Sequence, residues 1–327
     1  MEIKEPYNTG VEEVFSNFSK DPCLGKHCVI ECPVGFTCIR AVPPRSGEFR
    51  LDLSLCNLKC PFCWTINKPH PWYYGEIFEH VKCRFDKFCR SNLNVSIGYL
   101  RITGGEPILT EGRARHLLSL FQLIDDDLKR EDFYAIWKTR KSPENLEGRK
   151  NIKIQTNGIT ISKIVDLFVD KLISFKNISL TFEVSLKGTN PYEFQILSGG
   201  FPSERFFEQI KAIDRLLDCE DQGFPVFVRG ILGIFHSAQY DLVFEENGKR
   251  MMLDPCREFK KIVSRLQSMP RCRERVYVEP LRFTAQMKEA EETCRNLRIV
   301  ADSRVGRYIK PGKKIRLKDT YLEKMLS

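Results

Sequence analysis

The alternation of short apolar segments with longer amphipathic segments most constrains the fold of this 327-residue chain. Runs of mainly β-forming side chains predict strands, and helix-like segments lie between them. The predicted strands span 49–55, 96–103, 152–156, 178–186, 225–234 and 276–283, and the predicted helices span 77–88, 114–128, 162–175, 203–217 and 255–266. Strand, helix and strand repeated in this way indicate an α/β fold with a parallel sheet and right-handed crossovers. Six strands fit either a doubly wound open sheet or a partial barrel.

The chain divides into three parts by composition. Residues 1–46 are rich in cysteine, proline and glycine and show no sustained period, which predicts a loop-rich N-terminal cap shaped by bound metal. The strand and helix pattern occupies the core, 47–284, and a basic extension, 285–327, follows it. We expect one main domain with two appendages.

The thirteen cysteines would suggest a disulfide framework in a secreted protein. However, the N-terminus is charged from its second residue, and no apolar segment of a signal peptide follows it. No stretch approaches the ~18 consecutive apolar residues that a transmembrane helix needs. We therefore expect a cytoplasmic protein without a membrane partner, in which grouped cysteines bind metal.

The formal net charge of +9 favours a polyanionic partner, because lysine and arginine gain affinity by displacing the counterions of phosphates. Part of this charge lies near the end of the chain, at Arg304, Arg307, Lys310, Lys313, Lys314, Arg316 and Lys318. A solvated basic tail and a contact with nucleic acid are equally compatible with this run.

Three cysteines follow the first predicted strand directly, in the array Cys56-x3-Cys60-x2-Cys63. Thiolates are the usual protein ligands of iron–sulfur clusters, and a four-iron cluster normally takes four of them. Three ligands would leave one iron open to a substrate or cofactor, as at a catalytic metal. A zinc knuckle lacking one ligand and a set of buried thiols are the alternatives.

The second predicted strand ends in Gly104-Gly105-Glu106-Pro107. The two glycines allow the backbone to approach a ligand closely, and the carboxylate can accept hydrogen bonds from an ammonium group. An ordinary turn explains the tetrapeptide equally well when it is taken alone. Its position after the strand that follows the cysteine array favours a ligand site at the carboxyl ends of the strands.

These two motifs resemble those of the radical S-adenosylmethionine (radical SAM) superfamily, and the resemblance covers about 49–283. The superfamily has the same cysteine spacing with an aromatic residue before the third cysteine, here Phe62, which is expected to pack against the adenine. The resemblance implies a partial (β/α)6 TIM-like barrel and a 4Fe-4S cluster on Cys56, Cys60 and Cys63. It also implies that Gly104, Gly105, Glu106 and Pro107 hold the methionine end of S-adenosylmethionine, which the reduced cluster cleaves to a 5′-deoxyadenosyl radical.

Polar residues also follow the third and fourth predicted strands. Asn157 follows the third strand, and Ser185 and Lys187 lie at the end of the fourth. The fourth segment is similar to the Asp-Leu-Lys strand of glycyl-radical-enzyme activases, in which the lysine reaches the methionine moiety, although Ser185 replaces the aspartate. We predict cofactor contacts from Asn157 and Lys187. A surface lysine at a strand end is the alternative.

The last two predicted strands carry weaker signals. Gly230 and Gly233 fit a strand that contacts adenine in the superfamily, but close packing also explains them. Four residues, Arg229, His236, Glu279 and Pro280, are candidates to face the substrate. A structural role is the more common one for such polar residues, and no catalytic residue is assigned.

The N-terminal cysteines Cys23, Cys28, Cys32 and Cys38 form a second group with C-x4-C-x3-C-x5-C spacing. Four thiols in a short loop-rich segment can hold an auxiliary iron–sulfur cluster or zinc, and the absence of metal is the third alternative. The other cysteines, Cys83, Cys89, Cys219, Cys256, Cys272 and Cys294, are dispersed, and we expect small buried apolar side chains.

The motifs indicate a cofactor and leave the substrate open. The Cys63-Trp64 pair, the upstream cysteines and the basic balance resemble archaeal wybutosine-synthesis enzymes, which implies a tRNA substrate. The activase-like strand implies a partner protein instead, activated at a backbone glycine. A non-catalytic iron–sulfur electron carrier or sensor is the remaining alternative. As an enzyme, the protein would need an electron donor such as ferredoxin or flavodoxin.

Overall fold

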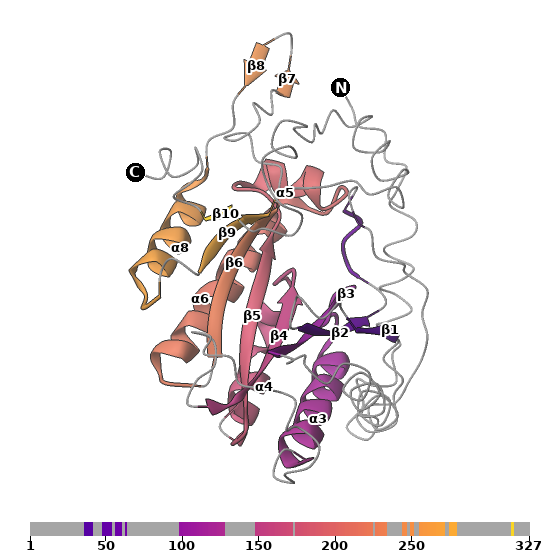
Figure 1. Cartoon of the computed structure of the whole chain (residues 1–327). Helices are drawn as coiled ribbons and strands as arrows, with labels where there is room; N and C mark the ends of the chain where they lie inside the picture. Colours follow the sequence, from indigo (N-terminus) through magenta and orange to yellow (C-terminus); the bar gives the residue numbers. More distant parts are fainter. Residues whose placement is uncertain are drawn as a thin grey trace. The chain divides into compact units, whose positions relative to one another are not determined.

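The computed structural model describes residues 36–41, 48–53, 56–60, 63, 98–127, 148–172, 174–224, 226–233, 244–246, 249–251, 255–271, 275–279 and 315–316. Strands and helices alternate along this part of the chain (Figure 1). The strands are β1 (Phe36–Ala41), β2 (Glu48–Leu53), β3 (Tyr99–Gly104), β4 (Lys150–Thr156), β5 (Ile178–Leu186), β6 (Val226–Gly233), β7 (Phe244–Glu246), β8 (Lys249–Met251), β9 (Val276–Glu279) and β10 (Ile315–Arg316).

The helices that separate the strands are α3 (Glu111–Asp127), α4 (Ile161–Leu172), α5 (Pro191–Leu197), the 3-10 turn η4 (Ser203–Arg205), α6 (Phe206–Asp221) and α8 (Arg257–Ser268). Eight strands form one sheet in the order β1-β2-β3-β4-β5-β6-β9-β10, and β7 pairs with β8 in an antiparallel hairpin. The chain therefore has a mixed α/β fold with a mainly parallel sheet, as the alternating pattern predicted.

The chain divides into two compact units. The first contains Met1–Asn57, Ile66–Ile152 and Asp170–Ser179, and the second contains Leu58–Thr65, Lys153–Val169 and Leu180–Ser327. The boundary passes through the cysteine array, so that Cys56 belongs to the first unit and the other two cysteines of the array to the second.

In the first unit, β2 pairs with β3 in parallel, and β1 pairs with β2 in antiparallel fashion. The core residues of α3 include Leu117, Phe121 and Ile124, which are all fully buried. Asp125 lies in the last turn of α3, and its carboxylate accepts hydrogen bonds from the backbone N–H groups of 176, 177 and 178 at 2.7–3.1 Å. This buried carboxylate thus fixes the loop that leads into β5.

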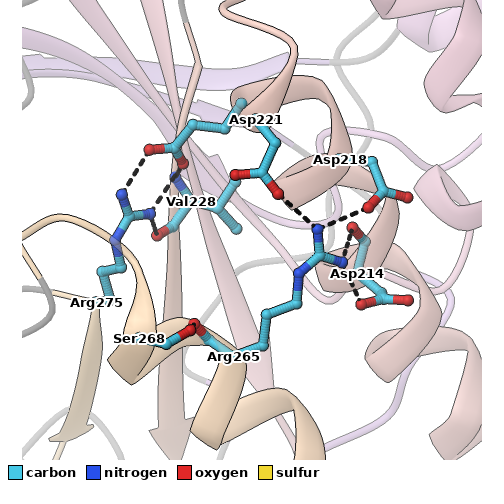
Figure 2. Close-up of polar contacts among 8 residues, drawn as sticks. Asp214, Asp218, Asp221, Val228, Arg265, Ser268 and Arg275 are labelled. Carbon is cyan, nitrogen blue, oxygen red and sulfur yellow. Dashed lines mark hydrogen bonds and ion pairs between the residues drawn. The ribbon is translucent and has the colours of Figure 1, made fainter.

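In the second unit, β5 pairs with β6 and β6 pairs with β9, both in parallel. Helices α6 and α8 pack against β6 and against each other. Two arginines link these elements. Arg265 of α8 bonds three aspartates of α6 (Figure 2). Arg275 donates to Glu220 of α6 at 2.5 and 2.8 Å. Arg275 is buried, so its carboxylate partner is needed to offset the cost of desolvation.

The two faces of β5 differ in chemistry. Phe182 and Val184 are buried on one face, where the Phe182 ring meets that of Phe168 on α4 edge to face at 5.7 Å. The alternate residues, Thr181, Glu183 and Ser185, are polar and point to the opposite face because side chains alternate along a strand. Consequently β5 presents polar side chains on the side away from α4, where its neighbour β6 places Arg229 opposite Glu183.

The structure confirms the predicted helices and strands that lie within its described residues, and β5 has the predicted bounds. The helix expected at 77–88 lies outside them. Several described elements were not predicted: β1, α5, the hairpin of β7 and β8, and the short strand β10. Strand β1 lies in the segment expected to be loop-rich, and it forms by pairing with β2, which local sequence does not reveal. Helix α5 is only seven residues long, too short for periodicity to detect, but its Asn190 cap and Pro191 are typical of a helix start.

Candidate functional site

The second part of the cysteine array lies against the end of α5. The backbone N–H of Lys59 donates to the carbonyl of Ser198 at 3.0 Å. Gly199 adopts φ +80°, and a Cβ atom at this position would lie 2.1 Å from the Lys59 carbonyl oxygen. A side chain therefore cannot be accommodated at Gly199 without moving the cysteine loop. The turn continues with the Cys63 N–H donating to the Cys60 carbonyl at 2.9 Å.

The Cys60 thiol lies close to two other predicted site residues. Burial raises its pKa to about 11, the positive charge of Lys187 acts to lower this pKa, and Cys63 acts to raise it. These electrostatic effects require the ammonium group of Lys187 and the thiol of Cys63 to lie near Cys60. The structure thus brings together three residues that the sequence singled out in two separate motifs.

A glutamine from α6 joins the ends of β4 and β5. The Gln209 side-chain amide donates to the Ser185 carbonyl at 3.0 Å and to the Asn157 carbonyl, and its oxygen accepts from the Lys187 N–H at 3.2 Å. Gln209 is 0% exposed. One buried side chain therefore positions the backbone at both predicted cofactor residues, Asn157 and Lys187.

Gln209 was missed in the sequence, although a signal for it was present. Along α6, Phe206, Gln209, Ile213 and Leu216 are all buried on the face that packs inward. A polar residue at a position of helical core spacing indicates a side chain that needs buried partners. The polar side chains at the strand ends also form hydrogen bonds with residues of the same region. Asn157 Oδ1 accepts from the Ile159 N–H at 3.1 Å, and Ser185 Oγ accepts from Gln155 at 3.4 Å.

The GGEP tetrapeptide forms a compact turn between β3 and α3 in the first unit. Gly104 has φ +94°, a conformation that favours glycine, and the Gly105 N–H donates to the Leu53 carbonyl at 2.7 Å. The Glu106 carboxylate is 2% exposed and accepts from the Ile108 N–H at 2.9 Å. Arg113 of α3 donates to the Glu106 carbonyl at 3.1 Å. Pro107 is buried within the same turn.

The remaining cysteine of the array, Cys56, is half-buried, and its thiol donates to Asn57 Oδ1 at 3.8 Å. Within the described residues, no three His, Cys, Asp or Glu side chains are close enough to hold one metal ion. The residues nevertheless fit an iron–sulfur cluster in donor type, because the thiols of Cys60 and Cys63 share one turn and belong to no disulfide. Cluster binding would keep these thiols deprotonated.

Other predicted positions have structural partners or lie outside the described residues. Arg229 forms a buried ion pair with Glu183 at 2.8 Å, and its guanidinium lies 5.1 Å from the centre of the Tyr277 ring. A Cβ atom at Gly230 would meet Leu266 and Leu186 at 3.4 and 3.5 Å, which is ordinary close packing. Cys219 is buried on α6, as predicted, whereas Cys256 is only half-buried.

Several predicted residues fall outside the described part of the chain: Phe62, Cys23, Cys28, Cys32, Cys83, Cys89, Cys272, Cys294, His236 and Pro280. Cys38 lies on β1 opposite Asp52, while Gly233 and Glu279 are paired at the ends of β6 and β9. The N-terminal metal group therefore stays a prediction. No described helix has the length and apolar character needed to cross a membrane.

Part of the chain is similar to a known protein. The chain is 22% identical over 173 residues to the GTP 3′,8-cyclase of Alkaliphilus oremlandii (strain OhILAs). The alignment covers 53% of this chain and 44% of the cyclase, so the chain spans less than half of that relative's length. No protein-family model matches. The similarity supports a relation to the radical SAM superfamily, without indicating a subfamily.

Proposed function

We propose that this protein is a radical SAM enzyme with a partial (β/α)6 barrel core. The observation that carries the proposal is the grouping of Cys60, Cys63 and Lys187 at the carboxyl end of β5, where a parallel sheet presents its ligand site. The similarity to a GTP 3′,8-cyclase supports the same superfamily. A cluster ligated by three cysteines, with bound S-adenosylmethionine, would supply a 5′-deoxyadenosyl radical for hydrogen abstraction from a substrate.

Each motif has a distinct role in this proposal. Cys56, Cys60 and Cys63 would hold the 4Fe-4S cluster, and Phe62 would pack against the adenine. The turn at 104–107 receives the methionine end, where the Glu106 carboxylate can accept hydrogen bonds from the amino group, since a carboxylate has about four acceptor positions. Asn157 and Lys187 contact the cofactor from the ends of β4 and β5.

The protein's own contribution is to orient the cofactor and exclude water from it. Glu106 is 2% exposed, and the Arg229–Glu183 pair buries two charges between β5 and β6. Charged groups interact more strongly in such a water-poor setting than at the surface. Electrons would come from a small donor protein such as ferredoxin or flavodoxin.

The test is release of 5′-deoxyadenosine by protein that is reconstituted with iron and sulfide under anaerobic conditions and reduced with dithionite. We expect Cys60→Ala to abolish release, because it removes one of three cluster ligands. Cys219→Ala is the matched control, since it removes a buried cysteine on α6 outside the array. An unchanged rate in Cys60→Ala, or no release by wild-type protein that holds an intact cluster, would refute the proposal.

A further inference from the structure

Helix α8 carries cations in two contrasting environments. Arg265 lies between three aspartates of α6 and is bonded to Asp214, Asp218 and Asp221 at 2.5, 2.7 and 2.9 Å (Figure 2). The three carboxylates more than balance the charge of Arg265, which links α8 to α6.

The other three cations of α8 line an open groove. This groove is shallow, and Arg257, Lys260 and Lys261 line it together with Pro255 and Ser264. These cations stand at i, i+3 and i+4 of the helix, so they share one face. Within the described part of the chain, no ion pair joins any of the three to a carboxylate, in contrast to Arg265.

Neither packing nor helix stability explains this arrangement. The helix is anchored by a different set of side chains, Phe259, Ile262, Val263 and Leu266, which are buried. Arg257 and Lys260 stand in the first turn, where the helix dipole disfavours positive charge. The three cations on one face of the helix repel one another, and an anion bound between them would lower their electrostatic energy.

The groove begins beside the candidate site. The N–H of Cys256, which directly follows Pro255, donates to the carbonyl of Thr189 at 3.0 Å. Thr189 lies two residues after Lys187, and Glu193 fixes it by accepting from its backbone N–H at 2.6 Å and its hydroxyl at 2.8 Å. A ligand in the groove would therefore extend toward the loop that carries Lys187.

We propose that this groove binds the phosphodiester backbone of a nucleic acid and leads it toward the loop at the end of β5. From 257 to 264 the helix rises about 10 Å, which is longer than a single phosphate group and suits a polymer of phosphates. None of the five lining residues is aromatic, so the groove offers no platform for base stacking. Lysine, arginine and serine are instead typical contacts of the nucleic-acid backbone, which position the partner without reading its sequence.

The test measures binding of a fluorescein-labelled, mixed-sequence 20-nucleotide RNA to the full-length protein by anisotropy between 50 and 200 mM salt. The groove variant combines Arg257→Gln, Lys260→Gln and Lys261→Gln. The control variant combines Lys171→Gln, Lys176→Gln and Lys211→Gln, which removes the same charge from exposed positions on other elements. Neither S-adenosylmethionine nor reductant is needed, so failure here is distinguishable from failure of the proposed enzyme activity.

We expect the slope of log Kd against log salt to fall by about 2 in the groove variant, because about 0.7 counterion is released per phosphate contact with a single strand. Wild-type protein would then lose roughly 15- to 20-fold more affinity than the groove variant across this salt range. The control variant should retain the wild-type slope, and circular dichroism should show that both variants are folded.

Equal loss in the groove and control variants would overturn the proposal, since net charge alone would then explain binding. Displacement of the RNA by micromolar GTP would also overturn it, because the groove would then prefer a single nucleotide. A DNA of the same sequence serves as a second arm. Binding of RNA and DNA with the same loss in the groove variant supports backbone recognition, whereas a loss confined to RNA supports the same groove with contacts to the 2′-hydroxyl.

Discussion

The turn after β3 and the loops around the end of β5 both carry predicted cofactor residues, but they are held in place in different ways. In the turn, near neighbours hold Glu106, which accepts from Ile108 and receives a hydrogen bond from Arg113 at its carbonyl, while Gly105 donates to the more distant Leu53. Near the end of β5, distant residues make the contacts. Gln209 bonds Lys187 and Asn157, and Ser198 bonds Lys59.

This difference shows which motif is shaped by its own residues and which is shaped by residues elsewhere in the chain. The GGEP turn brings its glycine conformation, its carboxylate and its helix start within ten residues, so its sequence largely specifies its shape. In contrast, the end of α5 positions the cysteine loop, and α6 positions the ends of β4 and β5. We therefore expect substitutions outside the motifs to damage the second region more than the first.

The largest effect is expected from Gly199→Ala, which would break the contact of the cysteine loop with α5. The new Cβ would lie 2.1 Å from the Lys59 carbonyl oxygen at φ +80°, so backbone must move. We expect a loss of more than about 3 kcal/mol in the free energy of unfolding, measured by denaturant titration, together with poor cluster incorporation.

Gly200→Ala is the matched control for this substitution. Gly200 also has a positive φ, of +89°, but nothing lies within 4 Å of a Cβ there. Its cost should be only about 1 kcal/mol, from backbone conformation alone. Equal costs for the two substitutions would show that the contact between Lys59 and Gly199 does not determine the position of the cysteine loop.

The next largest effect is expected from Gln209→Leu, which tests the strand ends. It would leave the Asn157 and Ser185 carbonyls and the Lys187 N–H without their buried partner. We expect about 3 kcal/mol of destabilisation and weaker binding of S-adenosylmethionine by calorimetry. The control is Gln122→Leu, whose side-chain hydrogen bonds are exposed and which should cost less than about 0.5 kcal/mol. Wild-type affinity in a folded Gln209→Leu protein would contradict a positioning role.

The smallest effect on stability is expected from Glu106→Gln, which tests the GGEP turn after β3. The amide oxygen can still accept from the Ile108 N–H, so the free energy of unfolding should change by less than about 1 kcal/mol. The loss of charge should weaken binding of S-adenosylmethionine about 10-fold, because hydrogen bonds to a charged acceptor are stronger. Glu111→Gln on the exposed surface of α3 should not change this affinity. A large stability loss with unchanged affinity would make Glu106 a structural residue.

Much of this architecture could be predicted because hydrophobic periodicity is a local property. The apolar segment of β5 has its predicted bounds, and the buried face of α3 follows the helical period. In contrast, β1 and α5 were not predicted, since a strand at an edge depends on its pairing and a seven-residue helix depends on its caps. In the sequence, Gln209 is one position of an amphipathic helix, and the partners of its side chain are distant along the chain.

The amino-acid sequence alone was sufficient to identify the thiols at 56, 60 and 63, the GGEP turn and their places after successive strands. Residue spacing and side-chain chemistry can be taken directly from the sequence. Only the tertiary structure showed that Lys187 lies near Cys60 and that Gln209 joins two strand ends. It also showed that Arg265 of α8 is ion-paired, whereas the other three cations of this helix line a groove. The physical reason is that desolvation and charge pairing depend on residues that are distant in sequence but close in space.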